Sequence, residues 1–182
     1  MNVVHDAVER AEQRWLWVVA GVVGFLMLMM AFTAWHWSAM PPSRVETVDP
    51  RTLHISGEFT EDNLGTGIEA DGRVVVRVVA QQYSFSPQCI VVPADTDVTF
   101  RGTASDAIHG FIVGRTNANV MLVPGFVATF RTQFRQQGEH LMPCHEYCGT
   151  GHEGMWARVQ VVPRDDFMRQ AQGGRRLSCV SR

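Results

Sequence analysis

The sequence predicts an all-β sandwich preceded by one membrane-spanning helix. Three observations indicate this class: a long apolar run near the N-terminus, a series of short segments rich in Val, Ile and Phe, and turn residues between those segments. A length of 182 residues suits one domain with additional segments. The formal net charge of −2 gives no bulk attraction to nucleic acid. We expect four parts: an N-terminal segment with its anchor helix (1–40), an acidic linker (41–72), the β domain (73–163) and a tail (164–182).

The apolar run covers residues 15–37 and contains no charged side chain. As a helix it rises about 34 Å, which exceeds the roughly 30 Å of a bilayer core, and tryptophans stand at both ends, as in interfacial belts. A cleaved secretory signal is the alternative, but signals have shorter apolar runs behind a basic segment. Here Asp6, Glu9 and Glu12 accompany the arginines. We therefore expect a retained anchor that ends at Pro41–Pro42, with the C-terminal domain outside.

The remainder of the chain changes from a polar linker to β-rich sequence. The linker is rich in Asp and Glu and shows no period, so we expect its charges to be solvated. Several short strands with regular turns over about 90 residues are typical of a sandwich. Adjacent glycines after Pro163 indicate a peripheral or poorly ordered tail. Turn signals with Pro or Gly at 86–87, 93–95, 124–125 and 137–138 separate the expected strands, which are 74–85, 89–92, 97–101, 110–114, 126–133 and 155–162.

A short segment near the C-terminus carries the most specific chemistry. Cys144, Cys148, His152 and Met155 lie within twelve residues, and His109 offers a second imidazole upstream. Soft donors of this kind suit copper, or an iron or zinc centre, and do not suit magnesium or calcium. The segment is therefore a candidate metal site.

The number of thiols decides between the kinds of centre. A mononuclear blue copper site needs two histidines, one cysteine and a distant methionine, and this chain adds Cys144 to such a set. Two thiolates on a loop that Gly149 and Gly151 allow to curl tightly can bridge two metals. A zinc site with two cysteines and two histidines is the alternative. The Cys-x3-Cys spacing and the otherwise unexplained Met155 argue against zinc.

The other two cysteines have no clear role in the sequence. Four cysteines are too few for a disulfide scaffold in a chain of this length. We expect Cys89 and Cys179 to be bystanders; a bridge between them is conceivable, but nothing in the sequence supports it.

The metal motif resembles the CuA centre of subunit II of haem-copper oxidases, the cytochrome c oxidases. The likeness extends to the single anchor helix, to residues 44–50, and to Ile108–Phe111 followed by 116–119, all of which resemble the ba-type, B-family branch. It covers roughly residues 9–163. The resemblance implies a cupredoxin-like Greek-key sandwich that holds binuclear copper.

When the family's ligands are matched to this sequence position by position, the resemblance implies six donors. They are Cys144 and Cys148, which bridge both coppers, His109 and Met155, which complete one copper, and His152 with the backbone carbonyl of Glu146, which complete the other. No catalytic residue is implied, because the oxygen chemistry takes place in subunit I.

The resemblance also suggests supporting roles. Asp106 is a candidate to orient an imidazole by hydrogen bonding. Tyr83 and Phe85 fall where the family places aromatic residues near its electron-entry patch, although ordinary core packing explains them equally well. Glu12 is a candidate proton-entry group at the mouth of a channel into subunit I. Glu146 stands where ba-type relatives tend to have glutamine, and it leaves open a magnesium ion at the subunit I boundary.

The function implied is electron entry into a terminal oxidase of the cell membrane. Cytochrome c would deliver electrons to the copper domain on the periplasmic or outer side, and haem in subunit I would receive them to reduce oxygen to water and move protons. The acidic stretch 46–71 could attract a basic cytochrome, or serve only solvation. His145, between the ligands, is expected to be exposed. Two other functions stay open: the CuA-bearing subunit of a nitric oxide reductase, and a stand-alone tethered copper carrier.

Overall fold

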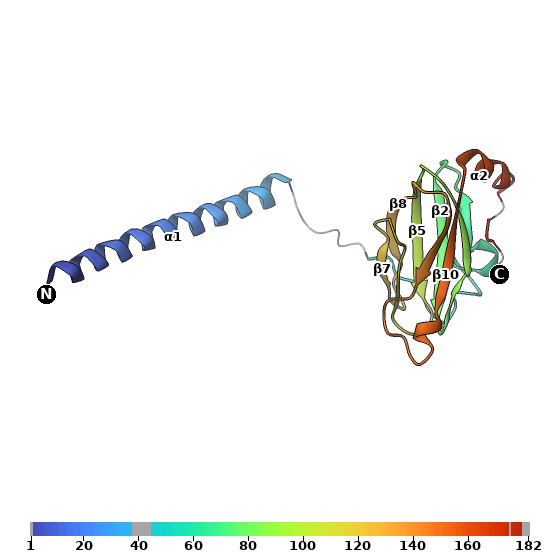
Figure 1. The fold of residues 1–182 in the computed structure, drawn as a ribbon, viewed down its shortest axis with the longest axis horizontal. Helices are drawn as coiled ribbons and strands as arrows, with labels where there is room; N and C mark the ends of the chain where they lie inside the picture. The colour runs from blue at the N-terminus through green and yellow to red at the C-terminus, as the bar shows by residue number, and fades with distance from the viewer. Residues whose placement is uncertain (1, 38–44, 175, 180–182) are drawn as a thin grey trace. The chain divides into compact units, whose positions relative to one another are not determined.

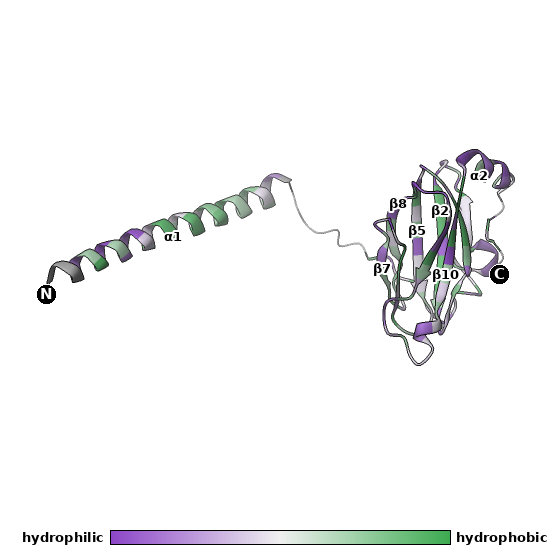
Figure 2. Cartoon of the chain, in the orientation of Figure 1, coloured by the Kyte–Doolittle hydropathy of each residue, from purple (hydrophilic) through white to green (hydrophobic). Residues whose placement is uncertain are grey.

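The computed structural model describes residues 2–37, 45–174 and 176–179 and divides the chain into two compact units, Met1–Arg44 and Val45–Arg182 (Figure 1). The first unit is the helix α1 (Asn2–Trp37). Within it, Asp6–His36 is long and apolar enough to cross a membrane, and Figure 2 shows the hydrophobic residues following the more polar N-terminal turns. The predicted apolar helix, long enough to span a membrane, is confirmed. The helix stop expected at Pro41–Pro42 lies outside the described residues.

The second unit is a β-sandwich, as the sequence predicts. One sheet has the strand order β1-β2-β5-β8 with β3 paired to β2, the other has the order β4-β10-β9, and β6 and β7 form a two-stranded ribbon. The pairs β2–β5 and β4–β10 are parallel, whereas the other pairs are antiparallel. The fold is cupredoxin-like and all-β. The strands are β1 (Gly65–Ile68), β2 (Val74–Gln81), β3 (Ser84–Ser86), β4 (Cys89–Pro93), β5 (Asp97–Ala104), β6 (His109–Ile112), β7 (Asn119–Leu122), β8 (Ala128–Gln133), β9 (Gly138–Pro143) and β10 (Trp156–Val162).

Strand β2 is buried along nearly its whole length because both of its faces are covered. Val74, Val76 and Val78 belong to the main core between the sheets. Val79, on the other face, packs with Leu53 and Phe59. A strand covered on both sides reads as a continuous apolar run rather than an alternating one, which explains why this strand was evident from the sequence.

The strand prediction differs from the structure where tertiary pairing outweighs local preference. The predicted strand 74–85 is two strands, because the chain reverses after Gln81 and returns antiparallel with Gln81 opposite Ser84. Three strands were not expected. β1 has the sequence GTGI, and β7 and β9 expose alternate side chains at the surface.

The segment expected as a linker belongs, from Val45 onward, to the compact second unit. Thr47 pairs with Phe126, and β1 adds an edge strand to β2. Two large apolar side chains of this segment, Leu53 and Phe59, are both 1% exposed. Residues 45–72 therefore cover the outer face of a sheet instead of spanning free solvent.

The C-terminal tail is also part of the sandwich and is not peripheral. Helix α2 (Arg164–Gln170) buries Phe167 in the main core. Leu177 then pairs with Thr66 of β1, and Ser178 pairs with Ile90 of β4. The tail thus joins the edges of the two sheets.

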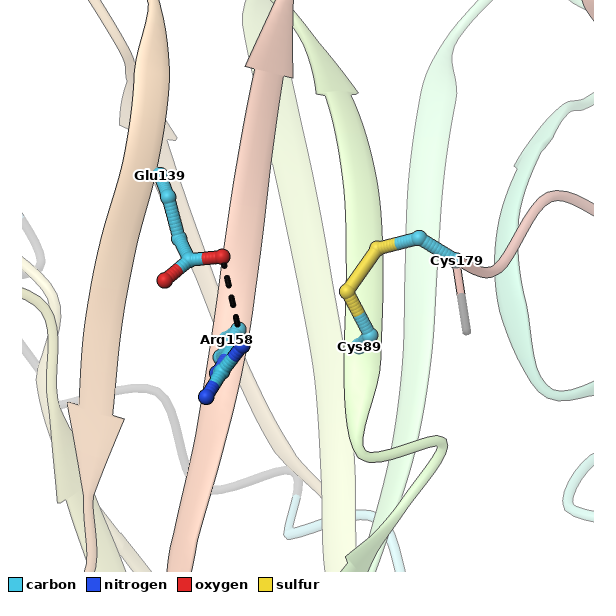
Figure 3. The surroundings of a disulfide bond; sticks show 4 residues. All are labelled: Cys89, Glu139, Arg158 and Cys179. Atoms are coloured by element: carbon cyan, nitrogen blue, oxygen red, sulfur yellow. Dashed lines mark hydrogen bonds and ion pairs between the residues drawn. A yellow bond between two sulfur atoms is a disulfide. The ribbon is translucent and has the colours of Figure 1, made fainter. Parts of the chain in front are cut away.

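A disulfide links Cys89 at the start of β4 to Cys179 in the tail (Figure 3). The expectation that both cysteines are bystanders was therefore wrong. The two residues are 90 positions apart, and their approach depends on the pairing of the tail with β4, which no local sequence pattern indicates. Figure 3 also shows Arg158 of β10 facing Glu139 of β9, with 3.5 Å between their charged atoms.

Three glutamates of the segment 46–71, which was expected to be solvated, form a network with arginines of the sheet and the tail. Glu58 pairs with Arg77 and Arg101, Glu69 with Arg77 and Arg176, and Glu46 with Arg101. These ion pairs neutralise three carboxylates of the segment, whereas Asp49, Glu61 and Asp62 remain exposed.

Replacing Glu58 should destabilise the domain in a pH-dependent way. Burial alone would raise the pKa of Glu58, but the hydrogen bonds and charges of Arg101 and Arg77 lower it below its ordinary 4.5. The charge of Glu58 therefore stabilises the fold at pH values above 4.5. This stabilisation is lost as the pH falls through the lower pKa of the folded state. The side chain of Glu58 is 23% exposed, so its ion pairs are intermediate between surface and buried ones. We expect Glu58→Gln to lower the free energy of unfolding by about 1 to 2 kcal/mol at neutral pH.

Chemical denaturation of the full chain in detergent at pH 7 and at pH 3 measures this effect. Glu61→Gln is the matched control, because Glu61 is an exposed glutamate of the same segment. The difference between wild type and Glu58→Gln should shrink at the lower pH. A difference that stays constant across that range would contradict the assignment.

Candidate metal centre

The predicted ligand residues meet at one end of the sandwich. Strands β9 and β10 pair up to Pro143 and Trp156, and the Cys144 N–H donates to the Met155 carbonyl at 3.0 Å. The residues between them form a loop that contains the short helix His152–Gly154. Figure 1 shows this loop in orange at the end of the sandwich opposite α2. A bridge between Phe111 and Cys144 brings β6 beside the loop.

Two thiols and two imidazoles face one another at this end. Cys144 Sγ lies 4.0 Å from His109 Nδ1, and Cys148 Sγ lies 3.7 Å from His152 Nδ1. The ligand atoms of His109, Cys144 and Cys148 are all within 4.8 Å of one another. Sulfur and nitrogen donors bind an ion at about 2.0 to 2.3 Å, so donors of one ion are at most about 4.5 Å apart. The two sulfur–nitrogen distances of 4.0 and 3.7 Å lie within this limit and fit metal binding.

The remaining two predicted donors complete the set. Met155 Sδ lies 3.7 Å from Cys148 Sγ, and the Glu146 backbone oxygen lies 3.3 Å from Cys144 Sγ. We call His109, Cys144, the Glu146 carbonyl, Cys148, His152 and Met155 the donor cluster. Each thiol of the cluster thus has two further donors beside it.

Burial shapes the chemistry of the donor cluster. His109 and Met155 are fully buried, and Cys144 and Cys148 are 8% and 5% exposed. Burial, followed by the neighbouring Cys144, raises the pKa of the Cys148 thiol to about 11. A thiol with this pKa is protonated at neutral pH, so a bound cation must displace its proton.

Asp106 supports the imidazole of His109 from behind. Asp106 Oδ1 lies 2.9 Å from His109 Nε2, which leaves Nδ1 directed toward Cys144. The same carboxylate accepts the backbone N–H groups of Ala107 and Gln82. Burial opposes ionisation, but the hydrogen bonds from Gln82, His109 and Ala107 lower the pKa of Asp106. A charged carboxylate in this position suits the predicted orienting role.

The two aromatic residues predicted near the electron-entry patch differ in position. Tyr83 is exposed and its ring lies against the ligand loop, so a Cβ at Gly151 would come within 2.6 Å of the ring. Phe85 is fully buried and packs edge to face on Phe111, with 6.1 Å between ring centroids. Phe85 is therefore a core residue and cannot form part of a surface patch.

Three more predicted residues have defined positions. His145 is only half-buried rather than exposed; its Nδ1 lies 3.5 Å from the Glu146 carboxylate, and its Nε2 is buried without a hydrogen-bond partner among the described residues. Glu146 itself keeps its carboxylate partly exposed. Glu12 lies exposed on α1, in the other unit.

The sequence did not identify Gln82, which contacts the site directly. Its side-chain amide donates to the Cys148 carbonyl. A glutamine at the end of an apolar strand gives no signal of such a contact, because the contact depends on the turn between β2 and β3 lying against a loop 66 residues away.

Comparisons with known proteins agree with this arrangement. The family model described as cytochrome c oxidase subunit II, periplasmic domain, matches residues 81–162. Two proteins named cytochrome c oxidase subunit 2, both from Thermus thermophilus, are similar to this chain. One is 32% identical over 159 residues, with 86% of this chain and 95% of the relative covered. The other is 34% identical over 122 residues, with 67% and 90% covered.

A solved structure gives a consistent result. One chain of a haem-copper terminal oxidase dimer, determined by cryo-EM, matches with a TM-score of 0.53 and 26% identity. The match covers 84% of this chain and 99% of that one, so it extends well beyond the ligand motif.

Proposed function

Because this chain belongs to the cytochrome c oxidase subunit II family, we propose that its donor cluster holds a binuclear copper (CuA) centre through which electrons enter the enzyme. The chain is a subunit of a haem-copper oxidase, an oxidoreductase complex, and we propose that subunit I is its partner there. An apolar helix suited to membrane anchoring precedes its cupredoxin-like domain. The copper centre, its electron donor and the periplasmic side are the finer points that we propose.

One observation carries the proposal. We assign His109 and Met155 to one copper, and His152 with the Glu146 carbonyl to the other. Cys144 lies beside a donor of each copper, His109 and the Glu146 carbonyl. Cys148 also lies beside a donor of each, Met155 and His152. Thiolates that bridge two ions require this placement. A single zinc ion with two cysteines and two histidines would leave the buried Met155 and the carbonyl without a role.

The residues of the chain perform distinct tasks in this function. Bound copper would supply a one-electron store between cytochrome c and the haem of subunit I, where oxygen is reduced to water. The buried thiols give up their protons to bind it, and Asp106 holds His109 in a fixed orientation. The paired strands β9 and β10 hold the loop ends in place. Tyr83, exposed beside the loop, is the electron-entry candidate, and the Glu146 carboxylate is the candidate for magnesium at the subunit I boundary.

The decisive test is spectroscopic. The full chain in detergent, loaded with copper, should bind two coppers and give a paramagnetic resonance spectrum in which one unpaired electron couples equally to two copper nuclei. Coupling to a single nucleus, or uptake of zinc in preference to copper, would exclude the binuclear centre.

Loss of the Asp106 carboxylate should weaken copper binding. Removal of a group that orients a metal-bound histidine typically costs about 10- to 100-fold in affinity, and we expect Asp106→Ala to fall in this range in a competition titration. Asp106→Asn, which keeps an oxygen acceptor, should lose less. Asp97→Asn is the control, since Asp97 is an exposed carboxylate at the start of β5. Wild-type affinity in Asp106→Ala would contradict the orienting role.

Glu12 keeps its proposed role in proton entry. In the intact complex, Glu12→Gln should slow turnover and proton movement, because the amide cannot take up a proton. Glu9→Gln, three residues earlier on α1, serves as the control. Unchanged turnover and pumping in Glu12→Gln would leave Glu12 as a solvated carboxylate only.

A further inference from the structure

The turn between β2 and β3 contacts both halves of the donor cluster. The side-chain Nε2 of Gln82 donates to the backbone carbonyl of Cys148. The backbone N–H of the same residue donates to Asp106 Oδ2 at 2.7 Å, and Asp106 Oδ1 lies 2.9 Å from His109 Nε2. The side chain of Gln82 therefore contacts the ligand loop. Its backbone N–H binds Asp106, which in turn contacts the imidazole of His109 on β6.

The ligand loop packs closely on this turn. A Cβ at Gly149 would lie 3.0 Å from Gln82 Nε2, and Gly149 has a φ of +135°, which side-chain-bearing residues rarely adopt. A Cβ at Gly151 would meet the ring of Tyr83. Both glycines are thus required where the loop crosses the turn. The amide of Gln82 is held against the peptide that carries the Cys148 thiol, although Gln82 as a whole is an exposed residue.

We propose that Gln82 is a positioning residue that holds Cys148 in place relative to His109. By doing so it adjusts the reduction potential of the copper centre, so this inference rests on the proposed function. An N–H donor at the Cys148 carbonyl draws electron density away from the peptide beside the thiolate. This favours the more electron-rich, reduced state. Groups that support metal ligands from behind tune the metal in this way. Without the donor, the reduced state is less favoured and the potential falls.

Two substitutions remove the donor in different ways. Gln82→Leu removes the amide, and Gln82→Glu keeps the shape but, as a carboxylate, can only accept hydrogen bonds. Both retain the backbone N–H that binds Asp106. In the copper-loaded full chain, we expect both variants to bind two coppers and to unfold at nearly the wild-type temperature. Their midpoint potential should fall by a tenfold change in the one-electron equilibrium constant or more, which is about 59 mV, and the coupling to the two copper nuclei should become unequal.

Gln81→Leu is the matched control. Gln81 is the adjacent glutamine, but it lines a surface hollow with His54, Leu64 and Ser178, apart from the donor cluster. Its substitution should leave the potential and the spectrum unchanged. A purely structural role for Gln82 would lower the unfolding temperature without moving the potential.

The outcomes separate this inference from the function on which it rests. Wild-type potential and spectrum in both Gln82 variants would overturn the inference. If Gln82→Leu does not fold, Gln82→Glu decides, since it preserves the shape of the residue. Absence of the paired-copper spectrum in the wild type would instead overturn the proposed function.

Discussion

Cys144→Ser should abolish the paired-copper spectrum and reduce copper affinity by more than about 100-fold, beyond the loss expected for a supporting residue. Cys144 lies beside donors that we assign to both ions, so a hydroxyl at this position removes a ligand from each copper at once. Any copper that remains should couple its electron to one nucleus only. Electron transfer from cytochrome c to the complex should then stop.

The fold should survive this substitution, which makes the result interpretable. Cys144 is a free thiol, and serine is only slightly smaller than cysteine. The unfolding temperature of the metal-free protein should therefore change only slightly. Ser105→Ala is a suitable control, because it removes a hydroxyl outside the donor cluster. Retention of equal coupling to two nuclei in Cys144→Ser would show that the centre does not depend on two bridging thiolates.

Loss of the Cys89–Cys179 disulfide should be the largest change in stability. The bond joins residues 90 positions apart, for which chain entropy gives about 4 to 5 kcal/mol, and measured losses are typically about 2 to 4 kcal/mol. We expect Cys179→Ala to lower the free energy of unfolding by about 3 kcal/mol and the melting temperature by about 10 °C. Denaturation of the metal-free protein measures both values.

Double substitution tests whether one bond accounts for the effect. Cys89→Ala combined with Cys179→Ala should be scarcely less stable than either single variant, because both remove the same linkage. Ser178→Ala, next to Cys179 in the tail, should be close to wild type. Additive losses in the double variant would mean that each cysteine acts through packing and not through the bond.

The sequence predicted those parts of the molecule that depend on local patterns. The anchor helix follows from one uninterrupted apolar run, and five of the six proposed donors lie in one short segment whose spacing is specific. The buried strand β2 follows from its continuous run of valines. In each case the residues that carry the signal are neighbours in the chain.

The features that the sequence did not predict depend on contacts between distant segments. Cys179 meets Cys89 only because the tail pairs with β4. Glu58 becomes an ion-pair partner only because its segment lies over the sheet that carries Arg77 and Arg101. Phe85 is placed in the core by the short strand β3, although its position beside Tyr83 in the chain suggested a common role.

The way in which β9 and β10 close the ligand loop has a practical consequence for protein engineering. Pro143 and Trp156 are paired neighbours, so the twelve residues between them leave and re-enter the sheet at adjoining positions. Such a segment can be replaced by another loop without changing the pairing of the strands on either side of it. Grafting a loop with a single cysteine between the same two positions would leave His109 and Asp106 unchanged. The domain would then carry a site for one copper ion.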